Sequence, residues 1–251
     1  MAIRTICCIC LFLTTLAGKG QTLADSIYDE IVSINKVYDS AFFLTFDVKM
    51  EYSSDTLWAG TDSADFVHTE LRGTYTFNGN KALYKLDNIE YMQNDSFAIA
   101  VYKDEKFILV GKTSATATGS FLPMRTMLDS MMAHMKADYV YMITTSDSVW
   151  QISFTANDSN VVYESMVLEY EPESHHLITI KYRLKDDGLY DPLPDSYDVR
   201  RADLIFLFQN YRVEQVSESV FSEDKYLFFD GPGDIKPASA YKDYIIYKNY
   251  Q

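Results

Sequence analysis

The clearest candidate for chemistry in this sequence is a stripe of methionines near midchain. Between Phe121 and Ala137, unbranched apolar side chains recur at spacings of three and four residues, which places them on one face of an amphipathic helix. They are Met124, Met127, Leu128, Met131, Met132 and Met135. Methionine is flexible and polarizable, so it adapts to apolar ligands of varied shape. The stripe predicts either a lid over a hydrophobic ligand or ordinary core packing.

Aromatic residues that alternate along the expected strands are the second candidate. They are Tyr75, Phe77, Tyr84, Phe97, Tyr102 and Phe107. The chain has 20 Tyr and 15 Phe against 2 Trp, a mix that suits half-buried strands in which one ring face packs and a hydroxyl stays in water. These rings either line a ligand cavity or fill a closed core.

Histidines and carboxylates give weaker signals for metal binding. His175 and His176, with Glu171 and Glu173 nearby, carry suitable donor atoms, but neighbouring residues of a strand point to opposite faces. The aspartates within 186–198 supply the oxygen ligands that calcium prefers, yet their spacing misses the helical calcium-loop pattern. We therefore expect a solvated acidic loop, no metal and no cofactor.

No motif for catalysis occurs in the sequence. The Gly-x-Ser-x-Gly elbow, the phosphate loop, the zinc-protease helix and the dinucleotide fingerprint are all missing. The carboxylates are abundant but form no pattern of acid and base. The prediction is a binding protein and not an enzyme, with an undetected hydrolase as a third choice.

An apolar run at the N-terminus predicts export. It follows Arg4 and is about eleven residues long, too short to cross a bilayer but typical of the centre of a secretory signal, with a buried first strand as the alternative. Cleavage near Gly20 removes a signal peptide of residues 1–20. The product, 21–251, is then a single periplasmic domain that starts at Gln21, as many exported proteins of the Bacteroidetes start with Gln.

All three cysteines, Cys7, Cys8 and Cys10, lie inside this apolar run, so the mature product has no thiol or disulfide. The formal net charge is −14 and becomes −16 when Arg4 and Lys19 are removed. Such an acidic surface repels nucleic acids and anionic membranes. Because no second long apolar segment exists, we expect no transmembrane segment in the mature chain.

The elements that must position these residues follow from hydrophobic periodicity. Residues 23–38 place Ile27, Ile31, Ile34 and Tyr38 on one helical stripe, which needs a sheet to pack against. From Phe42 the period changes to two. Strands are expected over 42–52, 67–77, 82–86, 96–102, 106–112, 139–145, 149–155, 161–170, 177–184 and 202–216.

Polar stretches separate these strands. Asn78-Gly79-Asn80 is a strong hairpin turn because Asn-Gly accepts positive φ. The stretches 53–65 and 186–201 are expected to be loops. The fold class is therefore α+β and mainly antiparallel β, in one domain that a Met-rich helix interrupts.

This order of elements resembles the LolA-like superfamily of periplasmic lipoprotein carriers. The resemblance is carried by the opening helix and long strand, the run Arg72–Tyr84, the Met-rich helix, and the segment Ile205–Val213 followed by Phe221. It covers most of the mature chain. It implies an open, strongly curved sheet, a half-barrel, whose concave face is covered by both helices and holds an apolar cavity for acyl chains. Carriers of this type usually have Asp-Gly and a Trp where this chain reads Tyr91–Phe97, so another ligand or a protein partner fits equally.

The expected function is thus a periplasmic binding or carrier protein for a hydrophobic ligand, such as a lipid or a lipoprotein acyl chain, in outer-membrane biogenesis. The alternative is a non-enzymatic structural or interaction protein of an envelope complex, with a core filled by its own side chains. The candidate ligand-binding residues are Met124, Met127, Leu128, Met131 and Met135 in the lid, and Tyr75, Phe77, Tyr84, Phe97 and Phe107 in the cavity.

A recurring dipeptide suggests a modification. Asp-Ser or Asp-Thr followed by a small or aliphatic residue is similar to the O-glycosylation acceptor pattern of exported Bacteroidetes proteins, although turn chemistry alone also favours Asp-Ser. Thr56 and Ser63 are the best candidate sites because both are expected in a loop.

Overall fold

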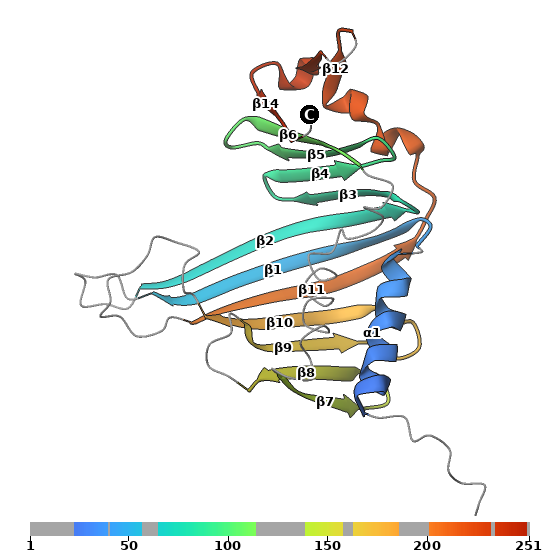
Figure 1. Ribbon diagram of the computed structural model, residues 1–251, viewed down its shortest axis with the longest axis vertical. Helices are drawn as coiled ribbons and strands as arrows, with labels where there is room; N and C mark the ends of the chain where they lie inside the picture. Colours follow the sequence, from blue (N-terminus) through green and yellow to red (C-terminus); the bar gives the residue numbers. More distant parts are fainter. Residues whose placement is uncertain are drawn as a thin grey trace, which may run out of the picture.

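The protein forms one large open β-sheet with a single α-helix among its described residues (Figure 1). The computed structural model describes residues 23–39, 41–56, 65–113, 139–157, 163–185, 201–231 and 234–249. The twelve-stranded sheet has the order β14-β6-β5-β4-β3-β2-β1-β11-β10-β9-β8-β7. All neighbouring strands in it are antiparallel except β14, which runs parallel to β6.

The strands divide into three groups along the sheet. Three long strands lie in the middle: β1 (Leu44–Thr56), β2 (Asp65–Asn78) and β11 (Arg201–Val213). One side continues with β3 (Lys81–Leu86), β4 (Ile89–Gln93), β5 (Phe97–Tyr102), β6 (Phe107–Lys112) and β14 (Ile245–Lys248). The other side consists of β7 (Tyr139–Thr145), β8 (Trp150–Ala156), β9 (Tyr163–Tyr170) and β10 (Leu177–Lys185).

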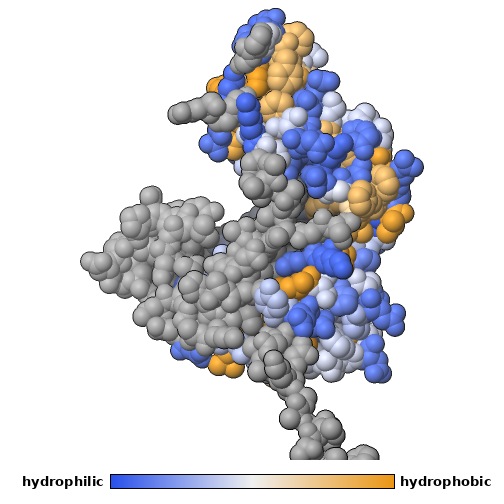
Figure 2. All heavy atoms as spheres, turned by 45° about the vertical axis from the view of Figure 1, so that its right-hand side comes forward, coloured by the Kyte–Doolittle hydropathy of each residue, from blue (hydrophilic) through white to orange (hydrophobic). Residues whose placement is uncertain are grey.

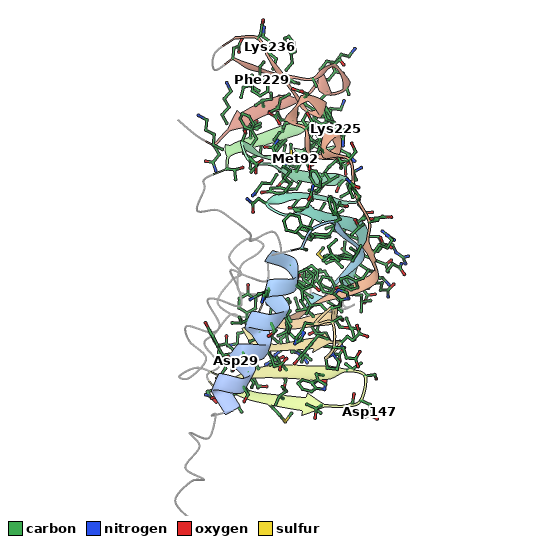
Figure 3. All side chains as sticks on the ribbon, turned by 90° about the vertical axis from the view of Figure 1, so that its right-hand side faces the viewer. Asp29, Met92, Asp147, Lys225, Phe229 and Lys236 are labelled. Atoms are coloured by element: carbon green, nitrogen blue, oxygen red, sulfur yellow. The ribbon has the colours of Figure 1, made fainter. Side chains whose placement is uncertain are left out.

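Helix α1 (Leu23–Asp39) lies against one face of the sheet, which we call the helix face (Figures 1 and 3). Its stripe of Ile27, Ile31, Ile34 and Tyr38 is buried, as the spacing predicted. The stripe packs on inward residues of the middle strands and of β7–β10, including Phe46, Phe154, Leu168, Ile180 and Phe208. The helix is thus held by a hydrophobic core over one half of the sheet.

A closed ring of hydrogen bonds fixes the end of α1. The Leu177 N–H donates to the Tyr38 hydroxyl at 2.9 Å, and the Tyr211 hydroxyl donates to the Leu177 carbonyl at 2.8 Å. Because the Tyr211 proton is used there, Tyr38 donates to Tyr211 across their 2.8 Å contact. Every polar group in the ring therefore has a partner, and the bonds polarise one another. Burial raises the pKa of Tyr38 to about 12.

The C-terminal segment, residues 214–249, covers the face opposite to the helix face over β3–β6. It contains three short 3-10 helices, η1 (Glu218–Phe221), η2 (Glu223–Lys225) and η3 (Ser239–Tyr241), and a small hairpin of β12 (Leu227–Phe229) and β13 (Ile235–Pro237), before β14. Its apolar side chains form a second core with strand residues of that face, namely Leu83, Met92, Ile99, Val101, Ile108, Val110, Phe221, Tyr226, Leu227 and Ile235.

Buried polar contacts fasten this segment to the sheet. The Glu90 carboxylate, 4% exposed, accepts a hydrogen bond from the Tyr226 hydroxyl at 2.6 Å and contacts the Lys225 ammonium. Burial opposes ionisation of Glu90, but Lys225 and Tyr226 outweigh it and lower the pKa of the carboxyl. Asn94 adds a second contact by donating to the Phe221 carbonyl at 3.0 Å. In Figure 3 Met92 and Lys225 lie at one end of the sheet, far from Asp29 on α1.

Several expectations need correction. The strand expected to end at Tyr52 continues to Thr56, so the first loop is shorter than 53–65. Strand β4 was not expected, because it is only five residues long and is flanked by the polar pairs Asp87-Asn88 and Asn94-Asp95. The parallel pairing of β14 with β6 was also not expected, since it joins segments far apart in the sequence. The Met-rich helix over Phe121–Ala137 and the signal peptide lie outside the described residues.

Within the described ranges, no helix combines the length and the apolar character needed to cross a membrane. In a space-filling view, hydrophobic and hydrophilic residues alternate over the described surface, and hydrophobic atoms gather at the upper end, which the C-terminal segment forms (Figure 2). Phe228 and Phe229 are exposed there.

Candidate functional site

Strand registers place one continuous row of residues on the helix face, from the core to the sheet edge. Tyr75 on β2 pairs with Tyr84 on β3, and Tyr84 pairs with Tyr91 on β4. The row continues through Ala100, Leu109 and Tyr247 on β5, β6 and β14. Because residues paired across neighbouring strands point to the same face, all six side chains lie on one side of the sheet.

The first rings of this row form a stack. Phe46 and Tyr75 lie parallel with centroids 5.5 Å apart, Tyr75 and Tyr84 are 5.0 Å apart, and Tyr84 and Tyr91 are 4.9 Å apart. Aromatic pairs at such separations attract each other beyond simple burial. The stack begins in the core under α1 and ends at Tyr91, which is half-buried. It therefore connects the helix-covered core to the more open part of the same face.

A second aromatic group lies beside the end of this row. Tyr102 stacks on Phe107 with centroids 4.3 Å apart, and Phe107 meets Tyr247 edge to face at 5.7 Å. Phe107 also pairs in register with Ile245 on β14. This second group thus reaches the edge strand β14, whereas the stack ends at Tyr91 on β4.

We call the helix-face surface of β3–β6 and β14 the aromatic face; it consists of Tyr84, Tyr91, Tyr102, Phe107, Leu109, Ile245 and Tyr247. Its outer members are exposed: Leu109 by 37%, Ile245 by 60% and Tyr247 by 53%. Burial nevertheless raises the pKa of the Tyr84 and Tyr91 hydroxyls, so their surroundings are of low polarity. A partly exposed, contiguous aromatic surface of this kind marks an interaction site more often than scattered apolar residues do.

Small residues lie next to the aromatic groups. Ala98 pairs with Gly111 and Ala100 pairs with Leu109, on the same face. Gly111 has an ordinary φ, and a Cβ built there meets its nearest atom only at 3.8 Å. The backbone therefore does not require glycine at this position. Its effect is to leave the surface beside Leu109 without side-chain bulk.

The structure separates the predicted cavity residues into three groups. Tyr75 and Phe77 lie on the helix face but belong to the core, with 6% and 3% exposure. Tyr84 and Phe107 lie on the aromatic face. Phe97 lies on the opposite face, where its ring is 5.6 Å from that of Phe229 in the C-terminal segment. The five lid residues, Met124, Met127, Leu128, Met131 and Met135, lie outside the described residues, as does Ser63. Thr56 is the last residue of β1.

The adjacent histidines His175 and His176 each contact a side chain of the fold. His176 stacks on the Tyr211 ring with centroids 4.1 Å apart, and burial lowers its pKa despite the nearby Glu171. His175, at φ +56° in the β9–β10 turn, lies 3.4 Å from the Glu30 carboxylate of α1. In the part of the chain that the structure describes, no group of three or more His, Cys, Asp or Glu side chains is arranged to hold a metal ion.

Sequence reasoning did not single out Tyr91, Leu109 and Tyr247. The alternation Ile89, Tyr91, Gln93 after Asp87-Asn88 is a signal that would have identified β4 and placed Tyr91 beside Tyr84. Tyr247 had no comparable signal, because its place depends on a parallel pairing between distant segments.

Comparisons with known proteins find similar solved structures at low sequence identity. No protein-family model and no curated protein sequence matches the chain. The structure is similar to a LolA superfamily protein from Nitrosomonas europaea, at 9% identity over 78% of this chain and 97% of that one, with a TM-score of 0.32. It is also similar to an outer membrane lipoprotein-sorting protein domain from Vibrio parahaemolyticus, at 11% identity over 78% and 96% of the two chains and a TM-score of 0.31.

A further similar structure is the Pseudomonas aeruginosa complex of MucA and MucB, at 10% identity over 78% of this chain and 60% of that chain, with a TM-score of 0.33. The chain thus spans less than two thirds of that neighbour. At these identities and TM-scores the function proposed below rests on the chain's own contacts. The superfamily that the sequence resembles is among its structural neighbours.

Proposed function

We propose that this protein is a non-enzymatic binding or carrier protein of the bacterial periplasm, and that it holds a hydrophobic, lipid-like ligand on the aromatic face. The observation that carries the proposal is the contiguous surface of Tyr84, Tyr91, Tyr102, Phe107 and Leu109, which joins the core at one end and is exposed at the other. Export rests on the N-terminal apolar run. Curvature of the sheet and a Met-rich cover over the ligand belong to the same proposal.

The binding step is the reversible removal of apolar surface from water. Each methylene that leaves water contributes about 0.8 kcal/mol, so ten methylenes give roughly 8 kcal/mol before the cost of ordering the ligand. This supports at best micromolar affinity, which allows release. The face also suits an acyl chain because Ala98, Ala100 and Gly111 leave space between aromatic groups.

Fluorescence of N-phenyl-1-naphthylamine tests the proposal with two matched variants. Leu109 and Val140 are both exposed aliphatic residues of strands, but Val140 lies on the face of β7 opposite to the helix face. Leu109→Glu should abolish the fluorescence enhancement that the dye shows with the wild-type protein, whereas Val140→Glu should leave it unchanged. No enhancement with the wild-type protein, or equal enhancement with both variants, would refute the proposal. Native mass spectrometry of the periplasmic protein should also detect a bound lipid.

A second candidate function, binding of an envelope protein, is favoured by strand β7. This strand ends the sheet, contains no charged residue, and exposes Val140 by 61% and Met142 by 55%. Edge strands without charge or proline tend to pair with strands of other chains. A photoreactive residue at position 140 that cross-links one envelope protein, combined with loss of that product in Met142→Lys, would favour this function over lipid binding.

A further inference from the structure

One polar side chain lies buried on the helix face beside the small residues. Gln93 ends β4, pairs with Ala82 on β3 and Ala98 on β5, and is 6% exposed. Its carbonyl oxygen accepts a hydrogen bond from the Tyr91 hydroxyl at 3.1 Å. The amide nitrogen of Gln93 has no hydrogen-bond partner among the described residues.

A buried amide nitrogen without an acceptor is unusual, because buried polar groups in folded proteins are almost always paired. An apolar residue would fill the same space without this cost. The Tyr91 hydroxyl holds the Gln93 carbonyl, and this contact orients the side chain with its N–H donors still free. The Gln93 amide is therefore a hydrogen-bond donor whose acceptor would come from outside the described residues.

The surroundings define which acceptor fits. Gln93 continues in register into Ala98 and then Gly111, so the side chains that follow it along this row are small. None of the helix-face residues of β3–β6 is charged: they are Ala82, Tyr84, Leu86, Ile89, Tyr91, Gln93, Ala98, Ala100, Tyr102, Phe107, Leu109 and Gly111. A carboxylate would find no cation on this face of β3–β6, because the lysines of these strands, Lys81, Lys85 and Lys112, do not lie at helix-face positions, and the net charge of −14 would repel it. An uncharged carbonyl meets neither obstacle.

We propose that Gln93 is the polar anchor of the aromatic face and selects ligands in which an uncharged carbonyl, an ester or an amide, is attached to an apolar chain. The carbonyl accepts from the Gln93 amide over Ala98 and Gly111, and the chain lies along Tyr91 and Leu109. This inference rests on the proposed function, which supplies the apolar part of the site, and adds the chemical class of the ligand.

The role of Gln93 is tested by displacing N-phenyl-1-naphthylamine with three competitors of matched length: methyl dodecanoate, tridecane and the dodecanoate ion. In the wild-type protein the ester should bind about fivefold more tightly than the alkane, and more tightly than the ion, because a single neutral hydrogen bond gives a factor of this order. Gln93→Leu should remove the preference for the ester and leave binding of tridecane unchanged or stronger. This variant removes the buried amide nitrogen that lacks an acceptor, but also the hydrogen bond from Tyr91, so its melting temperature should change little.

Two outcomes overturn different claims. If methyl dodecanoate and tridecane both displace the dye but the preference for the ester is absent, or persists in Gln93→Leu, the anchor is refuted and the apolar site stands. If the dye does not bind the wild-type protein at all, the proposed function itself fails. NMR spectroscopy tests the anchor on the wild-type protein alone. The ¹⁵N–¹H resonances of the Gln93 side chain should shift when methyl dodecanoate is added and not when tridecane is added. Equal shifts with the two compounds would also overturn the anchor.

Discussion

The half of the sheet formed by β7–β10 buries its helix face under α1, whereas the half formed by β3–β6 buries the other face under the C-terminal segment. In the first half the uncovered face carries charged residues on β9 and β10, namely Lys181, Arg183 and Glu169, and exposed apolar residues on the edge strand β7, Val140 and Met142. In the second half both faces are apolar: Leu83, Met92 and Ile99 point to the C-terminal segment, and Tyr84, Tyr91 and Leu109 point the other way.

Strands that are apolar on both faces normally belong to sheets covered on both sides. Here the second apolar face is half-buried near the core and exposed at Leu109 and Tyr247. The difference between the halves therefore identifies the surface that is built for a further contact. It also means that the two covers, α1 and the C-terminal segment, can be weakened separately.

The largest expected effect comes from the place where the middle strands meet β3. Gly73 on β2 lies so close to β3 that an added Cβ would be 1.9 Å from the Lys85 carbonyl oxygen. Because that atom is backbone, Gly73→Ala should destabilise the protein by about 3 kcal/mol in urea unfolding. Gly111→Ala is the matched control and should change the stability by less than about 0.5 kcal/mol. Equal effects of the two substitutions would contradict the described register.

Removal of the buried Glu90 carboxylate should destabilise only the C-terminal segment. Glu90→Gln takes the charged acceptor away from Tyr226 and Lys225, which should cost about 2 kcal/mol. Glu218→Gln, which breaks the exposed ion pair between Glu218 of the C-terminal segment and Lys81 of β3, should have a much smaller effect. Hydrogen exchange should show faster opening of 214–249 in Glu90→Gln and unchanged protection of α1. Faster exchange in both regions would mean that the covers are coupled.

The substitution that should destabilise only the attachment of α1 is Tyr211→Phe on β11. It opens the hydrogen-bond ring with Tyr38 and Leu177 and leaves a buried carbonyl unpaired, at a cost of about 1 kcal/mol. Exchange should accelerate in α1 while the C-terminal segment stays protected. Tyr247→Phe, at an exposed position, is the control and should have no measurable effect.

The smallest effect expected is a difference between the C-terminal segment and α1 in how their opening depends on pH. The pKa of Glu90 is lowered in the folded protein, so its contribution to stability is complete above the ordinary carboxyl pKa near 4.3 and is lost as the pH falls through the folded value. The ring at α1 uses hydroxyls, and the raised pKa of Tyr38, about 12, makes its contribution complete below about pH 10 and lost only above that. Acid should therefore open the C-terminal segment before α1, as hydrogen exchange corrected for intrinsic rates would show. Simultaneous opening would contradict this assignment.

Local periodicity was enough to predict α1 and most antiparallel strands. Ile27, Ile31 and Ile34 repeat at helical spacing, and β7 has the bounds that alternation gives for 139–145. The face to which a strand residue points also follows from alternation, but which face is covered does not. Phe97 and Tyr102 look alike in the sequence, yet they point to opposite faces of β5, and only the second belongs to the aromatic face. The C-terminal cover could not be predicted because its contacts, such as Glu90 with Tyr226, join residues far apart in the chain.

A photoreactive apolar ligand tests the central claim most directly. A diazirine analogue of methyl dodecanoate, irradiated with the wild-type protein and mapped by peptide mass spectrometry, should label residues of the aromatic face in β4–β6 and β14. The outward residues Val140 and Met142 of β7 should remain unlabelled. Labelling confined to β7 or to the exposed Phe228 and Phe229 of the C-terminal segment would contradict the assignment of the aromatic face as the binding site.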